Sequence, residues 1–382
     1  MGLNMTQIWV SRFDELHGKA IAQSGYEDFG DTDYHEGLRV LLASLDDEQL
    51  AGAHAAVAEG IIVTTLAARL QTQEQWRRHP DYRTREIPAP VIVIGMPRTG
   101  TTALHNLLSQ DPQFQGIEKW ICEAPQVRPP RETWSENPSH QACVALVAQL
   151  TAIAPEAIAA HGIQPDDVDE CLIPLSQDFC SNAFPSQLDL RLYDQWLMGA
   201  DETGSYARYK EILRLVGLND DRRWLLKNPS HVFGIDALLS VFPDACVVQT
   251  HRHPASSLAS LVNLLSNFNS AFMGEQIDRE RRLKREAEFW TEAVRRSMAA
   301  QDRHPERFVN VLQGDIRRNP LGVVQAIYDK FSLSLSAQAE QAMLAWARDN
   351  AEATGEGHNY QPIGKDAEMI APFAAYIERY GL

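Results

Sequence analysis

Two short runs of residues in this chain have the chemistry to bind an anion. The first is residues 95–102, Gly-Met-Pro-Arg-Thr-Gly-Thr-Thr, which follows an apolar β-branched run at residues 91–94. A strand, a glycine turn and a helix N-terminus in this order present backbone N–H groups and the positive end of a helix dipole to an anion. The candidate binding residues of this first loop are Pro97, Arg98, Thr99, Gly100, Thr101 and Thr102.

The spacing of Gly95 and Gly100 is similar to the beginning of an ATPase phosphate-binding loop, G-x-x-x-x-G-K-[ST]. Position 101 is Thr, so the lysine of that motif is missing, and Arg98 is the cation of the loop. No apolar strand ending in a magnesium-binding Asp is evident, because residues 246–249 run into Thr-His-Arg. The loop therefore favours an anionic donor other than ATP, and no metal site is expected.

The second run is residues 247–260, where a predicted strand ends in a basic turn. His251, Arg252 and His253 form the turn, and Pro254 opens a helix at a position that proline tolerates. Ser260 lies about two turns into that helix, since an α-helix has about 3.6 residues per turn. Arg252 and Ser260 can therefore contact one phosphate that lies along the helix.

The apolar periodicity predicts an α/β fold with a P-loop-like, mainly parallel sheet flanked by helices. Alternating strands and helices give such a sheet, with ligands at the carboxyl ends of the strands. We expect strands at residues 91–94, 224–226, 246–249 and 308–312. We expect helices at residues 102–109, 140–153, 205–216, 231–241, 255–267, 275–299, 321–331 and 337–348.

The first 87 residues contain no convincing strand, and residues 46–71 have helical apolar spacing. Residues 72–82 are polar, and Pro88 and Pro90 follow them. We therefore predict a helical N-terminal segment at residues 1–87, joined by a linker to a main α/β domain at residues 88–382 on which it packs.

Composition excludes several classes of partner. The chain has 382 residues, 44% of them hydrophobic, and a net charge of −16, which argues against a general nucleic-acid or anionic-membrane surface. Five scattered cysteines without a CxxC motif indicate a reducing cytoplasm. No apolar run approaches the roughly 20 residues of a membrane span. The acidic run at residues 166–170 is interpreted as a solvated helix N-terminus.

Together the two motifs resemble the sulfotransferases that use PAPS (3′-phosphoadenosine-5′-phosphosulfate). The resemblance rests on Pro-Arg-Thr-Gly-Thr-Thr at residues 97–102 and on Arg-x-Pro-x5-Ser at residues 252–260. It extends to residues 25–31, 105–108, 226–231, 242–245 and 376–382, and so covers nearly the whole chain. It is strongest with bacterial members of the family.

The resemblance implies a reaction and a division of roles. The first loop would hold the 5′-phosphosulfate of PAPS, and Arg252 with Ser260 would hold the 3′-phosphate. The enzyme would move a sulfuryl group to a hydroxyl or amine of a small-molecule, lipid or carbohydrate acceptor and release PAP, without a metal. Arg98 and Lys227 would stabilise the transferring group, because such transfers depend on positioning and cations.

An acceptor hydroxyl also needs a base, which related enzymes supply as a His or a Glu after the helix that follows the first loop. Glu123 is preferred, because it lies within the apolar residues 120–125, where burial makes a carboxylate a better proton acceptor. Glu118, next to Lys119, is interpreted as part of an exposed pair, and His105 is the alternative base.

Other functions and details stay open at this point. A P-loop kinase or ATPase and a non-catalytic nucleotide-binding scaffold are the alternatives to a sulfotransferase. Gln313-Gly314-Asp315-Ile316 stands where relatives have Tyr-x-Asp-Leu, so an aromatic contact to adenine is lost. Residues 357–360 are a weak candidate for a further 3′-phosphate contact. We expect the acceptor pocket to come from residues 120–137, 163–187 and 267–276, and the sequence does not indicate an oligomeric state.

Overall fold

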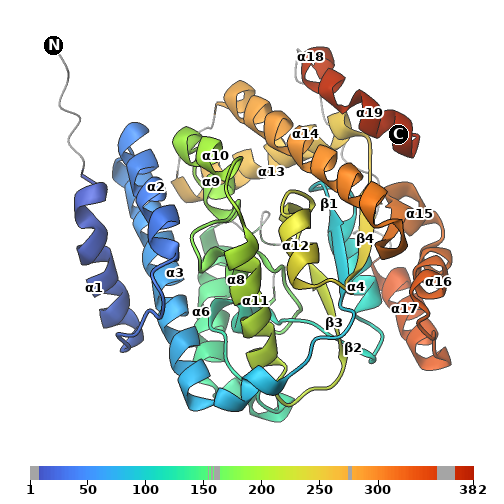
Figure 1. Cartoon of the computed structure of the whole chain (residues 1–382), viewed down its shortest axis with the longest axis horizontal. Helices are drawn as coiled ribbons and strands as arrows, with labels where there is room; N and C mark the ends of the chain where they lie inside the picture. Colours follow the sequence, from blue (N-terminus) through green and yellow to red (C-terminus); the bar gives the residue numbers. More distant parts are fainter. Residues whose placement is uncertain (1–7, 154, 156–157, 159–163, 274–277, 351–365) are drawn as a thin grey trace.

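The computed structural model describes residues 8–153, 155, 158, 164–273, 278–350 and 366–382 (Figure 1). Its centre is a five-stranded parallel sheet in the order β2-β3-β1-β4-β5. The strands are β1 (Val91–Gly95), β2 (Phe114–Gln115), β3 (Arg223–Lys227), β4 (Cys246–His251) and β5 (Phe308–Leu312). Because all five strands are parallel, their carboxyl ends meet at one edge of the sheet.

Helices cover both faces of the sheet (Figure 1). Before the acidic run at residues 166–170 they are α1 (Phe13–Ser24), α2 (Tyr34–Asp47), α3 (Gly52–Arg78), α4 (Thr101–Leu108), α5 (Lys119–Glu123) and α6 (Pro138–Ile153). The later ones are α8 (Leu172–Ser176), α9 (Ala183–Gln187), α10 (Arg191–Leu197), α11 (Thr203–Val216), α12 (Ile235–Val241), α13 (Pro254–Met273), α14 (Arg279–Arg303), α15 (Gln313–Arg318), α16 (Pro320–Phe331), α17 (Ala337–Asp349), α18 (Asp366–Ile370) and α19 (Ala374–Tyr380).

The core is divided by the sheet, because successive strand residues point to opposite faces. On β1, Val91 and Val93 pack against α4, α16 and α17. Ile92 and Ile94 face the other, larger core, which includes buried residues of α2, α3, α11, α12 and α14. The N-terminal helices therefore share a hydrophobic core with one face of the sheet.

The predicted α/β class with a parallel sheet is confirmed, and each of the four predicted strands is present. The two-residue strand β2 was not predicted, since two residues give no periodicity. The N-terminal segment is helical, as expected, and the helical spacing at residues 46–71 falls mainly in α3, which begins at Gly52, after α2 ends at Asp47. The expected linker also starts later, because α3 continues to Arg78, where Glu74 pairs with Arg77 and Arg78. The proposed division at residue 87 stays a prediction.

Helix α3 is long and apolar enough to cross a membrane, judged by length and composition alone. Its burial favours a different interpretation. Ile62, Leu66 and Leu70 have no exposed surface, and Arg69 is fully buried with ion pairs to Asp31 at 2.7 Å and Asp178 at 3.3 Å. A buried arginine paired with two carboxylates is typical of a helix that packs inside a folded protein, so we interpret α3 as a core helix.

Candidate functional site

The two predicted anion-binding runs lie side by side at the carboxyl edge of the sheet. Strands β1 and β4 are neighbours, and Gly95 stands opposite Thr250 in their register. Arg98 Nε donates a hydrogen bond to Ser260 Oγ at 3.0 Å, and Arg252 Nη1 donates one to the Arg98 carbonyl oxygen at 3.2 Å. Residues about 150 positions apart in sequence therefore form one site.

Three residues of the first loop have positive φ angles, which residues other than glycine rarely adopt. Gly95 has φ of +149°, and a Cβ there would overlap the Thr250 side chain. Gly100, with φ of +94°, directly precedes α4. Arg98, which follows Pro97, also has a positive φ, +69°. A non-glycine residue in this region stores strain, which is common where a side chain is held for function.

The threonines of the loop divide into structural and accessible side chains. Thr99 is fully buried, and its hydroxyl lies 2.6 Å from the Met96 carbonyl oxygen and 2.6 Å from Thr250 Oγ1. Any contact from Thr99 to a ligand must therefore come from its backbone N–H. Thr101 is buried at the start of α4, whereas Thr102 is exposed. The first turn of α4 thus offers N–H groups and one exposed hydroxyl to an anion.

The basic turn after β4 is supported from behind by the carboxyl-terminal helix α19. His251 Nδ1 lies 2.8 Å from the Tyr376 hydroxyl, and its Nε2 lies 2.9 Å from Asn310 Oδ1. The imidazole also stacks on Tyr380 with ring centroids 3.8 Å apart. Burial lowers the pKa of His251 to about 4, so this histidine is neutral at physiological pH. It supports the turn, and the charge of the turn comes from Arg252.

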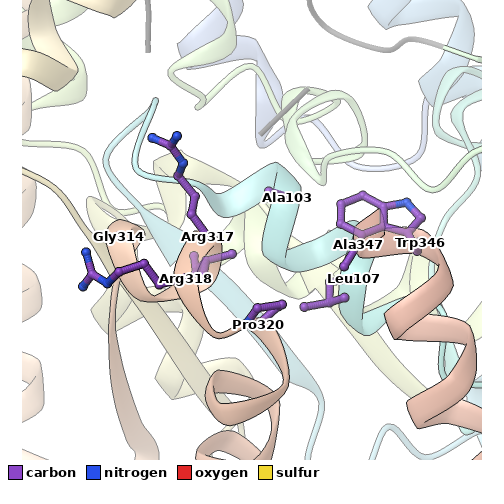
Figure 2. Close-up of a pocket in the computed structure, with 9 residues that line it drawn as sticks. Ala103, Leu107, Gly314, Arg317, Arg318, Pro320, Trp346 and Ala347 are labelled. Carbon is purple, nitrogen blue, oxygen red and sulfur yellow. The ribbon is translucent and has the colours of Figure 1, made fainter. Parts of the chain in front are cut away.

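A cavity of about 370 Å³ lies beside the first loop (Figure 2). Ala103 and Leu107 of α4 form one wall, and Trp346 of α17 closes another. Gly314 and the exposed Arg317 belong to α15, and the Arg317 side chain points away from Trp346. The cavity beside the first loop therefore has one aromatic side chain in its lining, Trp346, which sequence spacing did not reveal.

Lys227 brings a second cation to the first loop. It is the last residue of β3 and is only 3% exposed. Its Nζ donates to Thr102 Oγ1 at 3.3 Å and pairs with Glu170 Oε1 at 2.5 Å. The structure therefore brings Lys227 to the first loop, as expected, and adds Glu170, a carboxylate from the acidic run.

The interpretation of residues 166–170 as a solvated helix N-terminus is wrong. Val168 forms a bridge with Glu118, and Asp169 pairs with Lys119 at 3.3 Å. Burial would raise the pKa of Asp169, but Lys119 holds it below its usual range. The segment is a turn followed by a short bridge and is partly buried, and each of its last two carboxylates has a lysine partner.

The sequence predicted a buried Glu123 and an exposed Glu118, and in the structure Glu118 is the more buried of the two. Glu123 Oε1 accepts from Lys119 Nζ at 2.6 Å and is about one-fifth exposed. Burial alone would lower the pKa of Lys119, yet Asp169 and Glu123 raise it above its usual value. Glu118 is buried and pairs with Arg128 at 3.1 Å. The exposed pair predicted for Glu118 and Lys119 is therefore wrong.

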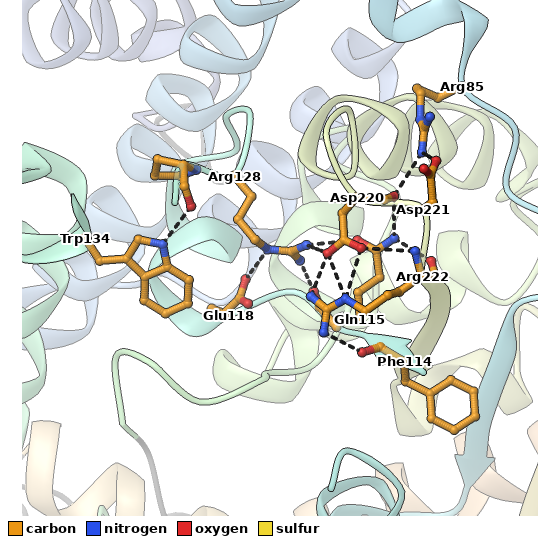
Figure 3. Close-up of polar contacts among 11 residues, drawn as sticks. Arg85, Phe114, Gln115, Glu118, Arg128, Trp134, Asp220, Asp221 and Arg222 are labelled. Atoms are coloured by element: carbon orange, nitrogen blue, oxygen red, sulfur yellow. Dashed lines mark hydrogen bonds and ion pairs between the residues drawn. The ribbon is translucent and has the colours of Figure 1, made fainter. Parts of the chain in front are cut away.

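Arg128 fixes the chain that follows Glu123 (Figure 3). Its guanidinium donates to Gln115 Oε1 at 2.8 Å, to Asp220 Oδ2 at 3.1 Å and to the Gly116 carbonyl oxygen, in addition to Glu118. A planar guanidinium with several acceptors in one plane is a strong anchor. This network holds the segment after α5 against the edge of the sheet.

His105, the alternative base, is 1% exposed, and its Nε2 lies 3.5 Å from the Leu225 carbonyl oxygen. Burial and the nearby Lys227 lower its pKa to about 3. A group with so low a pKa is a poor proton acceptor at neutral pH, because the ideal base titrates near the working pH. The structure therefore argues against His105 as the base.

Metal-binding and cysteine chemistry have little support in the part of the chain that the structure describes. No group of three or more His, Cys, Asp or Glu side chains within it is arranged to hold a metal ion. The five cysteines are all buried and free. Residues 357–360, the weak candidate for a 3′-phosphate contact, lie outside the described residues.

Comparison with known proteins decides the family. Residues 90–337 match the model of the sulfotransferase family, which is well over half of the chain. The chain belongs to the sulfotransferase family. The resemblance found in the sequence is confirmed, and the kinase or ATPase alternative is not favoured.

Solved and curated sulfotransferases give the extent of the similarity. The structure of STF1 from Mycobacterium tuberculosis H37Rv is 34% identical and superposes with a TM-score of 0.85 over 96% of this chain and 99% of that one. STF9 from Mycobacterium avium, at 24% identity and a TM-score of 0.83, covers 97% of each chain and shows the same fold. The curated omega-hydroxy-beta-dihydromenaquinone-9 sulfotransferase Stf3 of M. tuberculosis is 28% identical over 180 residues, 46% of this chain and 45% of its own length.

Proposed function

We propose that this sulfotransferase moves a sulfuryl group from PAPS to a hydroxyl or amine of a small-molecule, lipid or carbohydrate acceptor and releases PAP. The observation that carries the proposal is the contact of the two cationic turns, through Arg98 with Ser260 and through Arg252 with the Arg98 carbonyl. Two anionic groups at opposite ends of one donor fit two neighbouring cationic turns better than a single phosphate does.

The donor would lie across the carboxyl edge of the sheet. The N–H groups of residues 98–102 and the guanidinium of Arg98 would hold the 5′-phosphosulfate. Arg252 and Ser260 would hold the 3′-phosphate. The cavity between α4, α15 and α17 would take the adenosine, with Trp346 as its aromatic contact.

The transfer itself needs one bond to form and one to break. The acceptor oxygen bonds to sulfur, the bond from sulfur to the bridging oxygen breaks, and its electron pair stays on the 5′-phosphate of PAP. Arg98 and Lys227 stabilise the charge that develops on the sulfuryl and bridging oxygens. The acceptor proton passes to a carboxylate.

Glu170 fits the role of proton acceptor better than Glu123. Lys227 contacts both Glu170 and Thr102. A single side chain, that of Lys227, therefore connects Glu170 to the first loop. Glu123 is bound instead to Lys119, which pairs with Asp169, the chain neighbour of Glu170. We therefore propose that Glu170 accepts the proton of the acceptor hydroxyl and that Glu123 forms part of the wall around the acceptor.

Transfer and donor binding should be measured on the same preparation. We expect sulfate from labelled PAPS to appear on an acceptor without added magnesium, and PAP to bind in calorimetry. Tight PAP binding with no transfer to any acceptor would favour the non-catalytic scaffold instead. Magnesium-dependent ATP hydrolysis without PAP binding would contradict the donor assignment.

The location of the enzyme and its acceptor are also matters of proposal. Five free buried thiols fit a reducing cytoplasm. The name of the curated relative points to a hydroxylated menaquinone as that protein's acceptor. Because the match spans less than half of the relative, the acceptor of this chain has to be inferred from its own residues.

A further inference from the structure

A second cavity, of about 180 Å³, is lined in part by Leu172 and Ile173, which follow the acidic run at residues 166–170. Helices α3, α8 and α9 form its walls, and Glu123 at the end of α5 completes it. Six of its twelve lining residues are apolar, and Glu123 is the single charged side chain among them. Of the polar residues, Thr65, Ser176, Gln177 and Gln187 already donate hydrogen bonds to other protein atoms. The apolar members are Ile61, Ala68, Leu172, Ile173, Ala183 and Phe184.

One side of α3 lines the cavity, and another side packs in the core. Ile61, Thr64, Thr65 and Ala68 line the cavity, and their spacing of three, one and three places them on one side of the helix. The residues Ile62, Leu66 and Leu70 on another side are fully buried in the core. Thr64 is exposed, so the cavity opens to solvent at this residue.

The cavity also adjoins the residues that we assign to the transfer. Leu172 and Ile173 in its wall follow Glu170 by two and three residues, and two residues span at most about 7 Å. Glu123 pairs with Lys119, which in turn pairs with Asp169, the neighbour of Glu170. Ion pairs thus connect the cavity wall to the segment that contacts Lys227.

We propose that this cavity binds the carbon skeleton of the acceptor, and that the acceptor is an uncharged apolar alcohol whose hydroxyl reaches Glu170 and Lys227. This inference rests on the proposed function. A cavity of about 150 Å³ lined by aliphatic and aromatic side chains accommodates benzene, so this one accommodates a six-membered ring or a short alkyl chain. A sugar would find few partners for its hydroxyl groups, because most polar side chains of the lining are already bonded within the protein, and a carboxylate would face Glu123.

Three primary alcohols test the class of acceptor directly. Benzyl alcohol, 4-(hydroxymethyl)benzoate and glucose all carry a primary hydroxyl, and the first two differ only by a carboxylate. We expect kcat/KM for benzyl alcohol to exceed that for 4-(hydroxymethyl)benzoate at least tenfold and that for glucose by more. A preference for glucose or for the carboxylate would overturn the proposal.

Two cavity variants test the location. Thr64→Trp covers the mouth from an exposed position, where folding is at little risk, and Ala68→Leu fills the interior. We expect each to raise KM for benzyl alcohol at least tenfold and to leave PAP affinity within twofold of the wild-type value. Ala56→Leu, an exposed substitution on the same helix outside the cavity lining, is the control and should change neither constant.

The outcomes separate the two proposals. If PAP binds and benzyl alcohol is sulfated, but Thr64→Trp leaves KM for the alcohol unchanged, the cavity assignment is wrong and the proposed function stands. If neither PAP binding nor transfer is found, the proposed function itself is wrong. Glu123→Gln tests the effect of the carboxylate charge. The ratio of kcat/KM for 4-(hydroxymethyl)benzoate to kcat/KM for benzyl alcohol should rise at least fivefold in this variant. An unchanged ratio would contradict a contact between the acceptor and Glu123.

Discussion

The proposed donor side, formed by the two motifs, and the proposed acceptor side, formed by the ion pairs around the acidic run, are built in different ways. On the donor side, two short motifs follow neighbouring strands, and the sheet register alone brings Arg98 to Ser260. On the acceptor side, Lys119, Asp169 and Glu170 come from segments outside both motifs, and ion pairs join Lys119 to Asp169 and Glu170 to Lys227. The first arrangement depends on local backbone conformation, and the second depends on partners that are distant in sequence.

The largest expected effect is on the donor side. Arg98→Ala should lower turnover about 10³-fold, because it removes a preorganised cation at developing charge. Arg98 is exposed, so the variant should fold and unfold as the wild type does. Turnover with saturating acceptor and thermal unfolding would measure both. The exposed Arg77→Ala is the control and should keep full activity, whereas wild-type turnover in Arg98→Ala would refute the role of Arg98.

The next effect distinguishes the two carboxylates of the acceptor side. Glu170→Gln should lower kcat about 10²-fold or more, as loss of a general base does. PAP affinity should stay within twofold, and Glu123→Gln should change KM for the acceptor more than kcat. Single-turnover kinetics and calorimetry would measure these constants. A larger loss of kcat in Glu123→Gln than in Glu170→Gln would indicate that Glu123, the residue that the sequence favoured, is the general base.

The buried histidine beneath the first loop predicts a pH effect on stability. Burial and Lys227 lower the pKa of His105 to about 3, so the unfolded chain binds a proton below about pH 6.5 that the folded chain does not. This term therefore destabilises the fold as the pH falls from about 6.5 toward 3. Relative to the wild type, His105→Gln should reduce the slope of unfolding free energy against pH by up to about 1.4 kcal/mol per unit in that range.

Urea unfolding at pH 7, 6 and 5 measures this slope. An identical slope in the wild type and in His105→Gln would mean that His105 titrates normally and is accessible, which would restore it as a candidate base. Turnover between pH 5 and 8 should show no step assignable to this residue.

The smallest effect concerns support of the donor side from the carboxyl terminus. Tyr376→Phe removes the hydroxyl that bonds His251 Nδ1, a contact worth about 0.5–1.5 kcal/mol. We expect PAP affinity to fall two- to fivefold and kcat to change little, because the turn at Arg252 is less well held. Tyr380→Phe, which keeps the stacked ring, is the matched control. Equal PAP affinities in wild type and Tyr376→Phe would show that α19 does not support the turn.

Sequence patterns predicted the strand, turn and helix of the first motif for a physical reason, while its role in donor binding stays a prediction. A β-branched run, two glycines and a threonine pair specify strand, turn and helix within a dozen residues, and parallel strands must end at one edge. The structure places Arg98, Arg252 and Ser260 in contact there. The sequence analysis did not single out Trp346, which we propose as the aromatic contact to adenine. Its helix, α17, packs on α4, and residue spacing does not predict that packing.

The environments of the charged residues on the proposed acceptor side were predicted poorly, because their ion-pair partners are distant in sequence. The acidic run at residues 166–170 was noticed, but its lysines lie about 50 residues before and after it, so it was interpreted as solvated. Glu118 was considered exposed because Lys119 is adjacent, whereas Arg128 pairs with it in the fold. Residues 163–187 were expected to help form the acceptor pocket, and several of them line the second cavity, but a contribution from α3 was not expected.

A crystal structure of the enzyme with PAP tests the central claim most directly. We predict one PAP molecule across the carboxyl edge of the sheet, with its 5′-phosphate on the N–H groups of residues 98–102. Its 3′-phosphate should lie within hydrogen-bond distance of Arg252 and Ser260. A 3′-phosphate bound away from both residues, or a PAP molecule bound elsewhere on the chain, would contradict the account.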